Sequence, residues 1–150
     1  MTIEEVLKIG SPMAPSKKTV VHMMYTGDYV LKRINSLLKP YDLTSQQYNV
    51  LRILRGQRGQ AVPLSRIQER MINKNSNTTR LIDKLVNKNY VSRKIDSENR
   101  RKLKIGITKE GLKLLYKIDP LVDRLENKTT EKLSLNEMNI LNTLLEKIRH

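Results

Sequence analysis

The chain has 150 residues, a length typical of one domain, and a formal net charge of +14. It contains no cysteine, which excludes disulfides, thiolate metal sites and thiol redox sensing. With six Tyr but no Phe or Trp, aliphatic residues must fill the interior, which favours packed helices over an aromatic-rich β-sandwich. The most apolar stretch, 20–25, is too short to span a bilayer and no signal peptide is visible, so we expect a cytoplasmic protein without membrane contact.

The positive charge is concentrated in the middle of the chain. Residues 44–107 hold 15 Lys and Arg against 4 Asp and Glu, a net charge of +11, whereas the other 86 residues have a net charge of +3. Arg outnumbers Lys nine to six in this segment, and Arg is suited to bidentate contacts with phosphates and base edges. This pattern favours a nucleic-acid partner over an anionic membrane, an acidic protein or a surface that serves solubility only.

The N-terminal part predicts an arm followed by a long helix. Residues 1–16 hold a short helix-capable stretch that glycine and prolines interrupt, so we expect a loosely attached arm. In residues 17–39, apolar or small side chains recur at alternating intervals of four and three, which is a heptad seam, and Pro40 ends the helix. The seam comprises Val20, Met24, Gly27, Leu31, Ile34 and Leu38. A seam of about 33 Å needs a second helix to cover it.

Three shorter helices are expected next. The first has the capping-box pattern Thr44-Ser-Gln-Gln and runs to about Arg55, with Tyr48, Leu51 and Leu54 on one face. The second is expected over 63–71, with Leu64, Ile67 and Met71 facing inward. The third is expected over 76–88, with an apolar back formed by Thr78, Leu81, Ile82 and Leu85. Its outward face would carry Ser76, Asn77, Thr79, Arg80, Asp83 and Lys84, and Asn89 would end it in the left-handed conformation.

A hairpin and two end helices complete the chain. The alternating pattern predicts two strands, at residues 91–95 and 102–107, joined by a polar loop. A helix then follows Thr108, with an expected inward stripe of Leu112, Leu115, Ile118, Val122 and Leu125. A second capping box, Ser134-Leu-Asn-Glu, opens the last helix, whose apolar face holds Met138, Leu141, Leu145 and Ile148. These stripes lie outside the central segment, so we expect a second copy of the chain to cover them.

The central order of helices followed by a hairpin is typical of a helix-turn-helix with a wing. A recognition helix needs short polar side chains near its N-terminus, so that its backbone can approach base edges in the major groove. The residues expected there are Ser76, Asn77, Thr79, Arg80 and Lys84. The wing candidates are the consecutive Arg100, Arg101 and Lys102, because a narrow minor groove attracts inserted arginines. Asp96 or Glu98 is expected to brace one arginine.

Four stretches together resemble the multiple-antibiotic-resistance regulator (MarR) family. They are 43–51 (LTSQQYNVL), 76–85 (SNTTRLIDKL), 91–103 (VSRKIDSENRRKL) and 107–111 (ITKEG). The resemblance implies a mainly α fold with a small β-hairpin wing (α+β), a winged helix-turn-helix with dimerisation helices at both ends. It also implies a homodimer on a palindromic double-stranded DNA operator, acting as a repressor that a small aromatic effector releases.

The resemblance and the helix pattern together divide the chain into four parts. These are an arm (1–16), a dimerisation helix and connection (17–43), the DNA-binding region (44–107) and C-terminal dimerisation helices (108–150). One departure concerns the wing, because Asn99 stands where the family usually has Asp two residues before the wing arginine. Both loop arginines therefore remain candidates for the minor groove. No effector residues are assigned, since Met24, Tyr25 and Tyr29 are expected to pack in the core.

The sequence gives less support to other functions. An enzyme is not expected, because the carboxylates are scattered, no Gly-rich phosphate loop occurs and the only histidines are His22 and His150. His22 is expected to be partly buried and structural, and neither a metal site nor a cofactor is expected. The alternatives are a non-specific architectural or RNA-binding winged-helix protein, and a protein-interaction module that uses the end helices.

Overall fold

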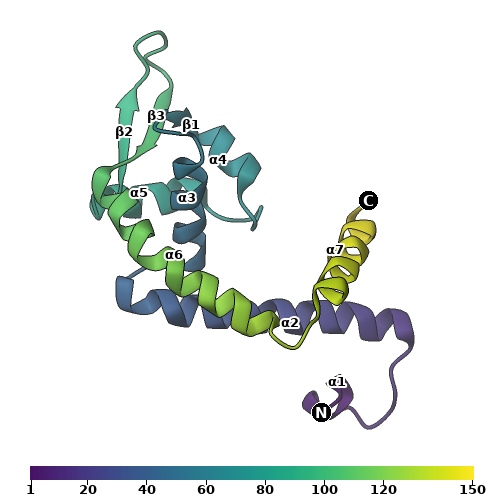
Figure 1. The fold of residues 1–150 in the computed structure, drawn as a ribbon. Coiled ribbons are helices and arrows are strands. Elements are labelled where there is room, and N and C mark those ends of the chain that lie inside the picture. Colours follow the sequence, from purple (N-terminus) through teal and green to yellow (C-terminus); the bar gives the residue numbers. More distant parts are fainter.

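The chain, described over residues 1–150 by a computed structural model, forms a winged module (residues 44–107) carried on long helices (Figure 1). Two long helices, α2 and α6, run alongside one another below the module, and the C-terminal helix α7 projects from their far end. The elements are α1 (Ile3–Val6), α2 (Pro15–Leu38), the 3-10 helix η1 (Lys39–Tyr41), α3 (Ser45–Arg55), β1 (Val62–Pro63), α4 (Leu64–Arg70), α5 (Thr78–Asn87), β2 (Val91–Ile95), β3 (Leu103–Ile107), α6 (Lys109–Thr130) and α7 (Leu135–Arg149).

The helix boundaries follow from caps that the sequence encodes. Thr44 and Ser134 both form complete capping boxes, in which the hydroxyl accepts the N3 backbone N–H and the N3 side chain accepts the cap N–H. Asn89 has φ 62°, so α5 is followed by a left-handed residue as expected. Thr108 caps α6 by accepting the backbone N–H of Gly111 at 3.0 Å. These caps confirm the expected positions of α3, α6 and α7.

The hairpin belongs to a three-stranded antiparallel sheet of order β1-β3-β2. The pairing of β2 with β3 runs from Val91 opposite Ile107 to Ile95 opposite Leu103. The strand β1 was missed from the sequence because only Val62 and Pro63 pair with β3, and two residues are too few to show an alternating pattern. By pairing with β3, the strand β1 joins the start of α4 to the hairpin. It therefore fixes the position of the wing relative to the helices.

The hydrophobic core lies inside the winged module and extends onto α6. Leu51, Ile67 and Leu85, from three different helices, have fully buried side chains. The inward stripe of α6 differs from the expected one: Leu112 is 42% exposed, whereas Leu114 is 8% exposed and joins the core. The reason is that α6 packs against both α2 and α3, so its buried face is wider than a single stripe.

The helices α2 and α7 leave most of their apolar side chains exposed in the single chain. In α2 only Leu38 is buried, whereas Met24, Tyr25 and Tyr29 are 72%, 43% and 47% exposed, so the expectation that these three pack in the core was wrong. No residue of α7 is buried. His22 is also exposed rather than partly buried.

The arm is attached more firmly than expected. Ile3 is only 4% exposed, and Glu4 forms an ion pair of 3.0 Å with Lys18 at the start of α2. This Lys18 hydrogen bond is the main cause that lowers the pKa of the Glu4 carboxyl. The arm is therefore held against the first turn of α2. None of the helices combines enough length with enough apolar character to cross a lipid bilayer.

Candidate nucleic-acid interface

The helix α5 has the two-faced character that the sequence predicted. Its back is formed by Thr78, Ile82 and Leu85, each exposed by 2% or less. The helix starts at Thr78 rather than Ser76, because the Asn77 side chain accepts the backbone N–H of Arg80 at 3.2 Å and acts as the N-cap. The expected helix was therefore too long by about one half-turn at its N-terminus.

The outward side chains of this helix are available for contact, with one exception. Thr79, Arg80 and Lys84 are exposed, and Asn77 is exposed although its side-chain oxygen Oδ1 caps the helix. Ser76 was expected to face outward, but it is half-buried and its hydroxyl oxygen is shielded without a hydrogen-bond partner. Because Ser76 lies in the turn before α5, its side chain points partly into the module instead of continuing the helix face.

The wing is a short, self-bracing loop between β2 and β3. The backbone N–H of Asp96 donates to the Lys102 carbonyl oxygen at 2.9 Å, which closes the loop. The Asn99 side chain accepts the backbone N–H of Arg101 at 3.1 Å. Asn99 therefore orders the loop through the backbone of Arg101 and leaves that residue's guanidinium free.

The expected acidic brace does not hold a loop arginine. Asp96 instead lies 3.9 Å from Lys104 on the neighbouring strand, and Glu98 forms no ion pair. Arg100, Arg101 and Lys102 are all exposed, and none of them takes part in an ion pair. Three adjacent positive charges are therefore presented at the tip of the hairpin, which projects away from the helices (Figure 1).

Most of the positive charge of the winged module is not neutralised within the chain. Of its 15 basic side chains, only Arg55, Lys88, Arg93 and Lys104 form ion pairs. The other eleven, among them Arg80 and Arg101, have no carboxylate partner. Unpaired charge at this density attracts a polyanion and favours release of its counterions.

A side-chain cluster that the sequence did not reveal fastens the module to α6. The Tyr48 hydroxyl donates to one oxygen of Asp119 at 2.8 Å, and Arg55 donates to the other oxygen. Partial burial raises the pKa of Asp119, but the hydrogen bonds from Arg55 and Tyr48 outweigh it and leave the pKa lowered. Burial, followed by the hydrogen bond to Asp119, raises the pKa of Tyr48. The partners are 64 and 71 residues apart, so no local pattern could have indicated them.

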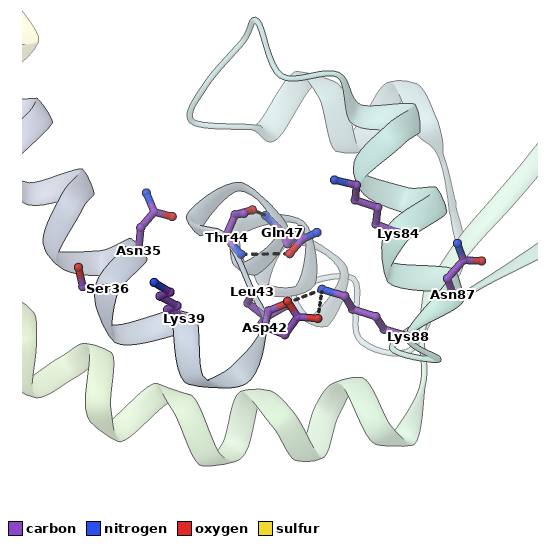
Figure 2. Close-up of a pocket in the computed structure, with 10 residues that line it drawn as sticks. All are labelled: Asn35, Ser36, Lys39, Asp42, Leu43, Thr44, Gln47, Lys84, Asn87 and Lys88. Carbon is purple, nitrogen blue, oxygen red and sulfur yellow. Dashed lines mark hydrogen bonds and ion pairs between the residues drawn. The ribbon is translucent and has the colours of Figure 1, made fainter.

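An open cleft of about 740 Å³ lies between α5 and the junction of α2 with α3 (Figure 2). Its walls are polar: Lys39, Lys84 and Lys88 supply cations, and Leu43 is the single hydrophobic residue of the lining. Lys88 is engaged by the Asp42 carboxylate at 3.2 Å. Met24, Tyr25 and Tyr29 do not line this cleft.

Comparison with known proteins shows a family to which part of this chain is similar. The MarR family model matches residues 43–103, which covers α3 through the start of β3. Over these residues the chain is similar to the MarR family. The chain is also 30% identical, over 82 residues, to the HTH-type transcriptional regulator SarZ of Staphylococcus aureus. That match spans 55% of this chain and 54% of SarZ, so the chain spans about half the length of the curated relatives it matches.

Solved structures confirm the winged-helix fold of this chain. Bordetella bronchiseptica BpsR, whose DNA binding is regulated by 6-hydroxynicotinic acid, superposes with a TM-score of 0.81 at 20% identity. The match covers 93% of this chain and 98% of BpsR. The S. aureus MepR–DNA complex superposes with a TM-score of 0.77 at 18% identity, covering 90% of this chain and 96% of MepR. The mainly α architecture with a small antiparallel sheet is thus the fold of these proteins.

Proposed function

We propose that this chain is a sequence-specific double-stranded DNA-binding transcription regulator. The observation that carries the proposal is the eleven unpaired basic side chains of the winged module, six of which lie on the recognition helix α5 and the wing hairpin. In this proposal Asn77, Thr79, Arg80 and Lys84 face the major groove, without the half-buried Ser76. Arg100, Arg101 and Lys102 face the flanking minor groove.

The two groups of residues have different tasks and can be tested separately. Arg101→Ala should weaken binding to all duplexes similarly and lower the salt slope of binding by about one, because a wing arginine neutralises phosphate charge. Arg80→Ala should instead change the preferred base at one position of the site. Binding isotherms at several salt concentrations, followed by selection from a random duplex pool, measure both effects. Unchanged affinity in both variants would show that these faces are wrongly assigned.

We propose that the chain acts as a homodimer on a palindromic operator. The apolar residues of α7 support this, because Ile140, Leu141, Leu144 and Ile148 are each at least 44% exposed in the single chain. At 100° per residue they and the half-buried Met138 and Leu145 spread over an arc of about 160°, wider than one partner helix covers. A second copy of the chain that packs its own terminal helices against α2 and α7 would cover the apolar faces of these two helices. Light scattering should give twice the 17.5 kDa chain mass, and a persistent monomer at micromolar concentration would contradict this.

We also propose that the regulator is a repressor that a small molecule releases. The cleft beside α5 supports an effector site, since its lysines would favour an acidic group on the ligand. The proposed ligand class, small aromatic compounds, is compatible with this when the ring carries a carboxylate. Titration of such acids into the protein–duplex complex should release the duplex. Release of equal extent by non-aromatic acids would contradict the aromatic preference.

The main alternative is an architectural or RNA-binding protein that uses the same charge. A regulator should prefer its selected site over random duplex by about 10³ or more at fixed salt. Competition with random duplex and with RNA of equal length therefore separates the two functions. Equal affinity for all competitors would favour the architectural alternative.

A further inference from the structure

The recognition helix carries one carboxylate among its DNA-facing cations. Asp83 is the only acidic residue of α5 and lies between Arg80 and Lys84 in sequence. Its side chain is 48% exposed, so it is not removed from the surface that faces the duplex. An uncompensated carboxylate at this place would repel phosphate oxygens.

A strand of the wing supplies the compensating charge. Arg93 in the middle of β2 donates to an oxygen of Asp83. Arg93 lies opposite Ile105 and two residues after Val91, both of them buried, so it leaves the sheet on the face that packs against the module. The ion pair therefore joins the recognition helix to the hairpin that bears the wing.

We infer that Arg93 is a positioning residue for DNA binding. It neutralises Asp83, which is the effect that duplex binding measures, and the same ion pair holds β2 beside α5, which is the effect that hairpin mobility measures. This inference rests on the proposed function. It adds a pair of residues that contact neither the major nor the minor groove of the duplex.

The chain offers a matched control within the same hairpin. Lys104 and Asp96 form another ion pair, at 3.9 Å, between adjacent ends of the wing strands. Lys104 is opposite Lys94, so it lies on the other face of the sheet from Arg93. Lys104→Gln therefore removes one positive charge from the hairpin without uncovering Asp83.

The test is a double-mutant cycle on the selected duplex. Arg93→Gln should weaken binding by about tenfold or more, whereas Asp83→Asn should stay within about threefold of the unaltered protein. The double variant Asp83→Asn/Arg93→Gln should return to within about threefold of Asp83→Asn, because no carboxylate remains to be neutralised. Arg93→Lys should retain binding, and Lys104→Gln should weaken it less than Arg93→Gln does. Thermal unfolding of each variant shows that it is folded.

Two outcomes would overturn the inference. If Arg93→Gln and the double variant are equally weak and both lose about one unit of salt slope, Arg93 contacts a phosphate directly. If Asp83→Asn changes the preferred base at one position, Asp83 reads a cytosine instead of being masked.

Hydrogen exchange in the free protein tests the link without DNA. Each single variant should speed exchange of the β2 and β3 amides to a similar extent, and the double variant should add nothing further. Unchanged exchange in all three would contradict the positional role. If the unaltered chain binds no duplex at all, the proposed function fails while this measurement still decides whether the pair couples helix and wing.

Discussion

The winged module and the helices α2 and α7 bury their residues to very different extents. Fourteen of the 22 buried residues lie in residues 44–107, one lies in the 24 residues of α2 and none lies in α7. Both regions have amphipathic helices with well-formed caps. The difference teaches that local pattern and capping determine a helix, whereas its stability in the folded chain depends on what covers its apolar face.

The largest expected effect comes from the same substitution made in each region. Leu51→Ala removes a fully buried side chain of α3 and should lower the free energy of unfolding by about 2–5 kcal/mol at any protein concentration. Leu144→Ala removes a side chain of α7 that is 52% exposed, and should change monomer stability by only about 0.5 kcal/mol. Denaturant titration at several protein concentrations measures both. In the proposed dimer, Leu144→Ala should lower the stability by an amount that depends on the protein concentration. Equal losses that do not depend on concentration would erase the contrast between the regions.

The junction between the regions should respond next most strongly. A Cβ added at Gly111, in the first turn of α6, would lie 2.4 Å from the Tyr90 carbonyl oxygen and 2.7 Å from Ile107. Because the first of these neighbours is backbone, Gly111→Ala should destabilise the fold by about 1–3 kcal/mol. Gly10→Ala is the control, since nothing lies within 4 Å of its added Cβ. Thermal unfolding compares the two, and a Gly111 variant as stable as the control would mean that α6 does not dock this closely.

Sequence patterns predicted the elements of the winged module well because its contacts are mostly made by regular amphipathic faces. Leu51, Leu54 and Leu85 were expected inside and are buried. The choice of Leu112 over Leu114 in α6 failed because leucines at both positions satisfy helical spacing, and only the elements packed around α6 decide between them.

The candidate site was predictable in residue type but not in local geometry. The polar character and exposure of Arg80 and Lys84 follow from helical spacing. The cap role of Asn77 and the half-burial of Ser76 depend on where the helix begins, which sequence patterns place only within a few residues. The cluster around Asp119 joins residues far apart in the chain, so it required the fold to be known.

The two capping boxes allow a smaller-scale comparison of the regions. Thr44→Ala should lower the global free energy of unfolding by about 1 kcal/mol, because α3 is part of the core. Ser134→Ala removes the same hydrogen bond from α7, which buries nothing in the single chain. It should therefore increase hydrogen exchange in the first turn of α7 without changing global monomer stability. A Ser134 variant that unfolds as early as the Thr44 variant would mean that α7 is part of the cooperative unit.

An effect that depends on pH is expected at Asp119. Asp119→Asn removes the charge that Arg55 and Tyr48 bind and should cost about 1 kcal/mol at neutral pH, since the Asp119 side chain is 29% exposed. The pKa of Asp119 is lowered from its ordinary value of 3.8 in the folded chain. Its contribution is therefore complete above the unfolded pKa and is lost as the pH falls through the folded pKa.

The unaltered protein should thus lose more stability than the Asn variant between about pH 5 and pH 2, and the two curves should converge at the acidic end. Tyr48→Phe is the matched control, because it removes one hydrogen bond to Asp119 and leaves the Arg55 ion pair and the ring in place. Tyr48→Phe should lower the free energy of unfolding less than Asp119→Asn does. Its free energy of unfolding should also depend less steeply on pH than that of the unaltered protein. Parallel curves for the unaltered and Asn proteins across this range would mean that Asp119 carries no native-state charge stabilisation. The contact between module and α6 would then rest on its apolar residues, Leu115 and Ile118 among them, alone.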